Sequence, residues 1–414
     1  MSVDSTSSDL LADSVFHNVR KLFVQNLLSQ MAFVVDKMAM RSVPASVVAF
    51  CGKATAYAFF FCPGVAEILV RLWGISQDSI RRVLGELDIP KFSNFTEVAE
   101  RIASGFPEHL RPLAFRSLPS LMKHLRCRPH LLFECSNIQW HGPWMGRWAG
   151  RDSDLLFVFV KQHHILTCDM LPESVTRIER ACAPSYVLVQ AQLLSVLDAT
   201  VHRAGNRPHP EINDGPSSIT FDDLLGADVP ATPLPLPAPN ASRLMAENRL
   251  IMLLRELLSD ASTVSLAARR AFAESFGNIL KAASRRTSIF DHNACFALCD
   301  FLEEAISILV RYHHDTDDPI SFLDWDFWRG VCERMMDSNN SMTEVRLYAF
   351  IYGIWGLVTK NGERKKQITL DWLLTEAHFQ RQFNHWCPMV RAYYMRLLCW
   401  RVARFDGEAT ETDL

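Results

Sequence analysis

Two short stretches of this sequence gather side chains that bind ligands or carry out reactions in proteins. The first is WHGPWMGRWAGRD, residues 140–152, in which three Trp alternate with three Gly, one Pro and two Arg. The second is FNHWCPMVRAYYMRLLCWRVARFDG, residues 383–407, which combines one His, two Cys and four Arg with several aromatic residues. Arginine binds phosphate and carboxylate groups, and tryptophan encloses apolar or cationic groups. Both stretches are therefore candidate binding sites.

The Gly and Pro of the first stretch predict an ordered loop instead of a helix. Its candidate binding residues are Trp140, Trp144, Arg147, Trp148 and Arg151. The favoured interpretation is that the Trp side chains wedge into a groove between helices, and the alternative is that they cage a ligand. A weaker alternative is an enzyme whose site uses the Arg residues of this loop, 140–152, with His141 and Asp152.

The second stretch predicts a helix that starts at Pro388 and stops near Gly407. Its apolar residues cover nearly the whole circumference, which is typical of a central, buried helix. Its candidate binding residues are His385, Arg391, Arg396 and Arg401. Since a buried Arg needs an acidic partner, we expect interhelical ion pairs with the carboxylates of Glu344, Asp324, Asp326 and Asp371. The alternative is a basic groove for a lipid headgroup or a phosphopeptide.

Other clusters of potentially reactive side chains are better interpreted as helix core. His385 and Cys387 offer only two metal ligands, and the thiols of Cys295 and Cys299 lie one helical turn apart, as buried thiols often do. The sequence contains no nucleophile elbow, P-loop, dinucleotide glycine fingerprint or zincin motif. We therefore predict a protein that is not an enzyme, with no catalytic residue, no metal and no cofactor.

Composition narrows the class of protein further. Of the 414 residues, 49% are hydrophobic, and the net charge of −3 gives no basic excess that would indicate nucleic acid binding. The first residues, MSVDSTSSDLLADS, lack the order of a secretory signal, and 11 Cys without regular spacing suggest reduced thiols. The sequence thus indicates a cytoplasmic protein, but it does not determine the oligomeric state.

The segments around these two stretches show helical periodicity in their apolar residues, so the predicted fold class is all-α. Eight of the 20 prolines fall within 204–240, which predicts a Pro-rich linker or disordered loop. The predicted domains are a disordered N-terminus (1–8), an N-terminal helical region (9–203), this linker, a C-terminal helical region (241–407) and a disordered tail (408–414).

In the C-terminal region the predicted helices are 242–258, 266–283, 292–313, 323–336, 342–359, 370–383 and 388–405. Alternate helix starts recur every 46–50 residues, at 242, 292, 342 and 388, which resembles the period of HEAT or armadillo-like helical pairs. We therefore expect an irregular α-solenoid. Ser341-Met-Thr-Glu344 predicts a capping box at one of these starts.

Residues 44–62 are the only serious candidate for a membrane span. The run is about long enough, but it contains Lys53 near its centre, and Pro63 ends it sharply. A buried helix is the favoured interpretation, a peripheral membrane contact comes next, and an integral span is the alternative.

Several long motifs resemble an uncharacterised fungal family that is catalogued as a domain of unknown function. They are FWRGVCERMMDSNNSMTEVRLYAFIYGIWG (327–356), residues 383–407, AYAFFFCPGVAEILVRLWG (56–74) and WMGRWAGRDSDLLFVFV (144–160). The resemblance implies a fungal source. Some members are labelled "membrane protein", members are often longer than this chain, and the resemblance implies no catalytic residue.

These observations predict a non-enzymatic helical scaffold or adaptor. We expect it to bind other proteins through a helical groove and to lie peripheral to a membrane, with lipid headgroups as a second kind of partner. The alternative is an integral membrane protein with a span near 44–62.

Overall fold

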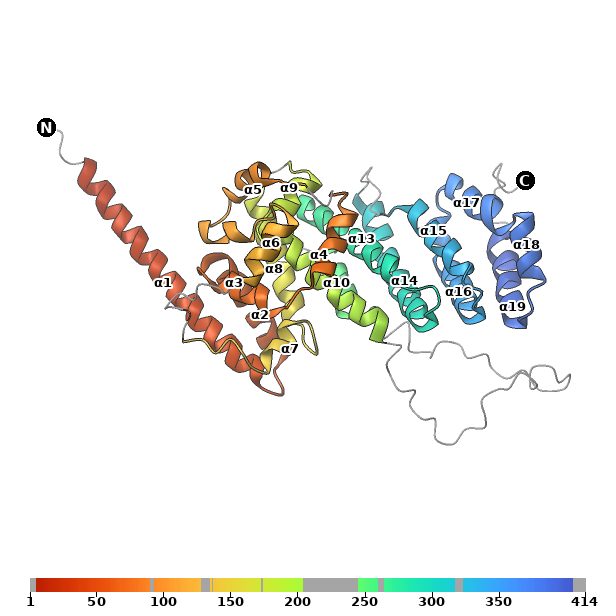
Figure 1. Ribbon diagram of the computed structural model, residues 1–414, viewed down its shortest axis with the longest axis horizontal. Helices are drawn as coiled ribbons and strands as arrows, with labels where there is room; N and C mark the ends of the chain where they lie inside the picture. The colour runs from red at the N-terminus through yellow and green to blue at the C-terminus, as the bar shows by residue number, and fades with distance from the viewer. Residues whose placement is uncertain are drawn as a thin grey trace. The chain divides into compact units, whose positions relative to one another are not determined.

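The computed structural model in Figure 1 describes residues 5–89, 93–127, 135, 137–172, 174–203, 245–259, 264–316 and 323–404. The chain divides into two compact units: unit 1 comprises 1–197 and 256–283, and unit 2 comprises 198–255 and 284–414. Every regular element of the described residues is a helix, which confirms the all-α fold class. The predicted linker at 204–240 and the tail at 408–414 lie outside the described residues.

The first half of the chain contains nine α-helices and one 3-10 helix up to residue 182 among the described residues. They are α1 (Ser5–Ala39), α2 (Ala45–Phe61), α3 (Val65–Leu72), α4 (Gln77–Glu86), α5 (Thr96–Ala103), η1 (Glu108–Leu113), α6 (Leu118–Arg126), α7 (Trp144–Trp148), α8 (Leu155–Met170) and α9 (Arg177–Cys182). α10 (Tyr186–Arg203) follows.

The core of unit 1 forms around α2, which packs against both α1 and α8. Gly52 lets α2 approach α8 closely, because a Cβ at this position would lie only 2.6 Å from the Cβ of Val158. Further along α2, Phe59 and Phe60 are fully buried, and their rings lie 5.4 and 5.2 Å from the imidazole of His163 on α8. Residues 45–61 therefore form one side of a packed helical core, as the favoured interpretation of 44–62 predicts.

Among the described helices, none combines the length and the apolar character needed to cross a membrane. α2, which covers most of the span predicted as the alternative at 44–62, is one of these helices.

The second half contains the helices α12 (Arg249–Leu258), α13 (Leu266–Arg286), α14 (His292–Thr316), α15 (Trp325–Met336), α16 (Ser341–Val358), α17 (Gly362–Ile368), η5 (Thr369–Leu373), α18 (Glu376–Phe383), α19 (Pro388–Leu397) and η6 (Leu398–Val402). The short elements η5 and η6 are π-helices.

Within unit 2, α16 lies between α14 and α19, and α15 and α18 pack beside α16 and α19 respectively. A buried ion pair joins α14 to α16: the Arg346 guanidinium contacts the carboxylates of Asp300 and Glu303, and the Arg346 Nη2–Glu303 Oε2 distance is 3.2 Å. This pairing stabilises a charge that would otherwise be costly to bury. The prediction that the whole array is an α-solenoid remains a prediction.

Several predicted boundaries differ from the structure. The stretch 140–152 contains the five-residue helix α7, so the prediction of a loop without helix was wrong. The predicted capping box at Ser341 was also wrong, because Asn340 is the N-cap of α16 and its side chain accepts from the N–H groups of Met342 and Thr343. Asn offers a nearby acceptor one residue before the serine, and it therefore takes the capping role.

Three predicted helices have different bounds or are broken. The helix predicted at 242–258 is interrupted: Met245 and Ala246 are helical, Glu247 and Asn248 are not, and α12 begins at Arg249, where the Asn248 side chain accepts from the N–H of Leu250. The one predicted at 370–383 is divided into η5 and α18, and α17 precedes them. The N-terminal helical region was expected to start at Asp9, but α1 starts at Ser5. Residues 5–8, which were predicted to be disordered, are therefore helical.

Candidate functional site

The three Trp of the 140–152 stretch are buried and their indole N–H groups are satisfied by backbone carbonyls. Trp140 donates to Cys135 O at 3.0 Å, Trp144 donates to Trp140 O at 3.1 Å, and Trp148 donates to Leu69 O at 2.9 Å. Trp73 of α3 stacks on Trp148 with ring centroids 4.9 Å apart and donates in turn to Trp148 O. These contacts support the interpretation of the Trp side chains as wedges between helices.

The basic residues of this stretch lie at its surface. Arg147 donates from Nη2 to the carbonyls of Met40 and Arg41, at 2.7 and 2.9 Å, and so satisfies the carbonyls that follow the end of α1. Arg151 is exposed. Gly150, at φ 89°, follows α7 in a left-handed conformation, and a Cβ there would lie 2.8 Å from the Leu156 side chain. The structure thus buries the Trp side chains, whereas His141, Arg151 and Asp152, which the enzyme alternative named, are exposed.

The C-terminal stretch does not form the enclosed central helix that its composition predicted. One face of α19 and η6 is buried, through Val390, Tyr394, Leu397 and Leu398, whereas Cys399 is exposed and Trp400 has 62% of its surface exposed. Helical periodicity cannot distinguish a surface that is buried by a neighbour from one that is not, and this explains the error.

The predicted partners of the C-terminal arginines were also wrong. Arg396 and Arg401 both lie over the ring of Tyr352, with their guanidinium carbons 5.1 and 4.2 Å from its centroid, and Arg391 donates to the carbonyls of His385 and Trp386. The aromatic face is attractive to a planar cation, and among the described residues no ion pair joins these three arginines to a carboxylate.

Glu344, one of the four carboxylates expected to pair with these arginines, lies beside His385 instead. Glu344 is buried in α16, and its Oε2 is 3.2 Å from Nε2 of His385, a separation typical of an ion pair although its geometry does not make a hydrogen bond. Burial raises the pKa of Glu344, and the nearby His385 and Arg381 partly oppose this effect. His385 also accepts the N–H of Cys387 at Nδ1, so it links α16 to the start of α19.

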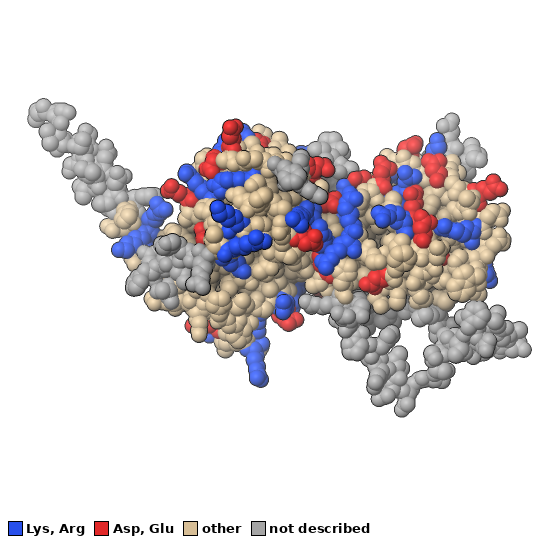
Figure 2. Space-filling view, viewed as in Figure 1, with Lys and Arg blue, Asp and Glu red and all other residues tan. Residues whose placement is uncertain are grey.

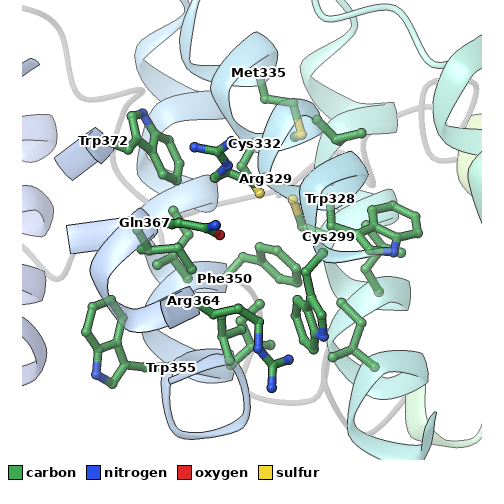
Figure 3. A pocket seen from close by; sticks show the side chains of 18 residues that line it. Cys299, Trp328, Arg329, Cys332, Met335, Phe350, Trp355, Arg364, Gln367 and Trp372 are labelled. Carbon is green, nitrogen blue, oxygen red and sulfur yellow. The ribbon is translucent and has the colours of Figure 1, made fainter. Parts of the chain in front are cut away.

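The sequence interpretation missed an apolar pocket in unit 2, which Figure 3 shows. It is narrow and partly open, and about 720 Å³ of space, including the part open to solvent, lies between its walls. The walls come from α14, α15, α16, α17 and η5. The aromatic side chains in them are Trp325, Trp328, Phe350, Trp355 and Trp372. Concave apolar surfaces of this kind with a few polar groups are the usual form of a small-molecule site.

Three polar side chains, Arg329, Arg364 and Gln367, are part of the pocket lining. The Nε of Arg329 is buried and has no hydrogen-bond partner among the described residues, and its Nη1 lies 3.7 Å from Glu333 Oε1, at the edge of ion-pair range. Arg364 lies over the ring of Trp325 at 4.7 Å, and desolvation lowers its pKa. The pocket therefore presents one incompletely satisfied cation, Arg329, beside an apolar surface.

The thiols in this pocket are not activated. Burial raises the pKa of Cys332 to about 12 and that of Cys299 further above the usual range. A thiol with a raised pKa remains protonated and is a poor nucleophile.

A second feature that the sequence interpretation missed is an exposed surface on α1 and α2, called here the α1–α2 face. It comprises Val19, Leu22, Phe23, Phe33 and Met40 of α1 with Phe50 and Tyr57 of α2. Ring contacts between Phe33 and Phe50 at 6.2 Å, and between Phe23 and the half-buried Phe61 at 5.8 Å, place the aromatic residues of the two helices side by side.

The segment that carries the α1–α2 face is basic as well as apolar. Between residues 17 and 61 there are five basic residues and one acidic residue, Asp36, a difference of +4 in a chain whose net charge is −3. The basic residues are Arg20, Lys21, Lys37, Arg41 and Lys53. Figure 2 shows Lys and Arg side chains on the described part of α1, whereas both signs of charge are interspersed over the visible face of unit 2.

Local spacing could have revealed both features. Phe50, Lys53 and Tyr57 recur at i, i+3 and i+7 and so share one face of α2, and four of the chain's ten Trp fall between residues 325 and 372. The first pattern was hidden within a continuous apolar run, and the second became a pocket only because α14 to α17 pack together.

Comparison with known proteins shows similarity to proteins whose function is not established. Residues 276–402 match the family model described as "Protein of unknown function (DUF1765)". The chain is similar to "UPF0592 membrane protein C7D4.03c" of the fission yeast Schizosaccharomyces pombe, with 24% identity over 411 residues, 92% of this chain. No solved structure matches. These findings confirm the resemblance to an uncharacterised fungal family.

The chain spans only 41% of the length of the fission-yeast relative. The matched family segment, 276–402, includes the pocket of unit 2 and most of the C-terminal stretch.

Proposed function

Given this kinship with an uncharacterised fungal family, we propose that the chain is a non-enzymatic helical scaffold that attaches peripherally to an anionic membrane surface. The observation that carries the proposal is the α1–α2 face, where exposed aromatic side chains lie among basic ones. Large exposed apolar patches mark interaction sites.

The chemistry of the α1–α2 face fits a lipid surface. Helices that lie in the membrane interface bury Phe and Leu at the level of the acyl chains and place Lys and Arg near anionic headgroups. Each Lys or Arg near such a surface contributes about 1 kcal/mol of attraction. Lys37 illustrates the arrangement, since its ammonium lies 5.5 Å from the ring of the exposed Phe33. The name of the fission-yeast relative, a membrane protein, agrees with this proposal.

The scaffold part of the proposal is supported by the row of α14, α16 and α19 in unit 2, with α15 and α18 packed alongside. Stacked helix pairs of this kind occur in α-solenoids, including HEAT and armadillo-like arrays, which bind other proteins along a continuous groove. A scaffold of this kind would hold protein partners close to the cytoplasmic face of a membrane.

The state of the buried reactive groups supports a non-enzymatic role. Burial raises the pKa values of Cys51, Cys168 and Cys295 to about 11, and it lowers those of His163 and His378 to about 3 and 4. At neutral pH these thiols are protonated, and these imidazoles are far from the pKa that suits a general base.

The test is co-sedimentation of the purified chain with phosphatidylcholine vesicles that do or do not contain phosphatidylserine. We expect binding only when phosphatidylserine is present, and weaker binding at high salt because charges are then screened. Lys53→Glu should weaken binding by about tenfold or more, because it reverses one charge at the surface. Phe50→Ser should weaken it independently of salt.

The matched controls are Lys360→Glu and Phe290→Ser, which change an exposed lysine and a 75% exposed phenylalanine away from the α1–α2 face. Both should bind vesicles like the unchanged chain. The proposal is wrong if the folded chain ignores phosphatidylserine vesicles, or if the controls lose as much binding as Lys53→Glu and Phe50→Ser.

A further inference from the structure

The pocket of unit 2 has an apolar interior, and its lining includes Arg329, whose Nε has no hydrogen-bond partner among the described residues. We propose that it binds a single-chain anionic amphiphile, with the alkyl chain among the Trp and aliphatic side chains and the carboxylate or phosphate head at Arg329. This site is independent of the α1–α2 face.

The apolar part of the argument comes from the walls. The indole rings of Trp325, Trp328, Trp355 and Trp372 and the ring of Phe350 provide most of the larger side chains, and Ile354 and Met335 lie between them. A narrow, partly open pocket of this kind accommodates one flexible chain better than a rigid ring system. Transfer of an alkyl chain from water to such walls contributes about 0.8 kcal/mol for each buried methylene.

The anionic part of the argument comes from Arg329. Its Nε is buried without a protein partner in the described residues, and it has only a long contact with Glu333. A buried donor without an acceptor is destabilising, and an oxyanion supplies the missing acceptor. Arg364 lies apart from Arg329, over the ring of Trp325, and is not part of the proposed head site (Figure 3).

The arrangement in Figure 3 agrees with a ligand that has two different ends. Arg329 and Gln367 lie toward Trp372, whereas Phe350, Cys299 and Trp328 extend away from them. If the anionic head lay beside Arg329 and Gln367, the alkyl chain would extend along Phe350, Cys299 and Trp328 (Figure 3). Glu333 is the acidic group that an anion would displace, and it is partly exposed, so its release into water is inexpensive.

The probes are dodecanoate, dodecyl phosphate and dodecanol, each added to the purified full chain below its critical micelle concentration and without vesicles. Four of the ten Trp lie in the pocket wall, so ligand binding is measured as a saturable change in Trp fluorescence and checked by calorimetry. We expect at least one of the two anions to bind about tenfold or more tightly than dodecanol, because a charge-assisted hydrogen bond forms only with the anions. The preferred anion identifies the head as carboxylate or phosphate.

The variant Arg329→Gln should weaken binding of the preferred anion by about tenfold and leave dodecanol binding unchanged. Arg334→Gln is the matched control, since it removes the same charge from an exposed position of the same helix, outside the pocket lining. Val331→Phe, which fills the pocket from a half-buried position, should weaken all three ligands. Thermal unfolding followed by circular dichroism establishes that each variant is folded.

Failure of the folded chain to bind either anion saturably would overturn the proposal. Equal affinity for dodecanol, or an equal loss in Arg334→Gln and Arg329→Gln, would do the same. The membrane proposal is tested separately, because Lys53→Glu should retain dodecanoate or dodecyl phosphate binding while it loses vesicle binding.

Discussion

The stretches at 140–152 and 383–402 have similar side chains but use them in opposite ways. Both are rich in Trp and Arg. In the first, Trp144 and Trp148 are completely buried, whereas in the second Trp386 and Trp400 are 67% and 62% exposed. The difference teaches that the same residue types become core or surface according to what the rest of the chain places around them.

The polar atoms of the two stretches show the same contrast. The buried indoles of the first stretch each donate to a backbone carbonyl, which satisfies the N–H groups that burial removes from water. In the second stretch the arginines lie over Tyr352 or donate to nearby carbonyls at the surface. The first stretch should therefore contribute strongly to stability, and the exposed part of the second should contribute little.

The largest expected effect is that of Trp148→Ala. Trp148 is fully buried, stacks on Trp73 and lies 4.7 Å from the ring of Phe159, so truncation leaves a cavity and removes these contacts. We expect the free energy of unfolding to fall by about 3–5 kcal/mol. Chemical denaturation followed by circular dichroism measures it. A change below about 1 kcal/mol would show that the stretch is not part of the core.

An intermediate effect is expected from acid, because a buried imidazole lies close to each region. Burial lowers the pKa of His163, which packs on Phe159 beside Trp148, to about 3, and that of His378, which contacts Tyr394, to about 4. The unfolded chain binds these protons near pH 6.5, so it holds more protons than the folded chain between about pH 6.5 and 4. Each such histidine therefore contributes its full stabilisation above about pH 6.5. As the pH falls below this value, the free energy of unfolding decreases by about 1.4 kcal/mol per pH unit for each of them.

Denaturation curves at a series of pH values test this expectation, and the slope of unfolding free energy against pH is the quantity to compare. His163→Gln and His378→Gln should each reduce that slope by about one proton between pH 6 and 4.5. An unchanged slope in either variant would contradict the assignment of a neutral, buried imidazole to that position.

The smallest effect is expected from Trp400→Ala, the counterpart of Trp148→Ala in the exposed stretch. Because most of Trp400 already contacts solvent, the free energy of unfolding should change by less than about 0.5 kcal/mol. The same denaturation measurement applies. A loss comparable to that of Trp148→Ala would mean that another molecule or a further part of the protein covers Trp400 in solution.

Much of the local structure was predictable from the sequence. Pro44 and Pro63 separate α2 from its neighbours, and α13, α14 and α15 begin within two residues of their predicted starts. The site residues were less predictable. The spacing of Arg391, Arg396 and Arg401 suggested acidic partners, but Arg396 and Arg401 lie over Tyr352, which is 44 and 49 residues earlier in the chain.

The sequence by itself determined the fold class, the helical character of 44–62 and the resemblance to an uncharacterised fungal family, because these depend on local periodicity and on long motifs. Only the tertiary structure decided which helix faces are covered. It buried Trp148, left Trp400 exposed and enclosed the pocket beside Arg329. The physical reason is that burial and desolvation arise between segments distant in the chain, whereas a sequence pattern records only which side chains share a face.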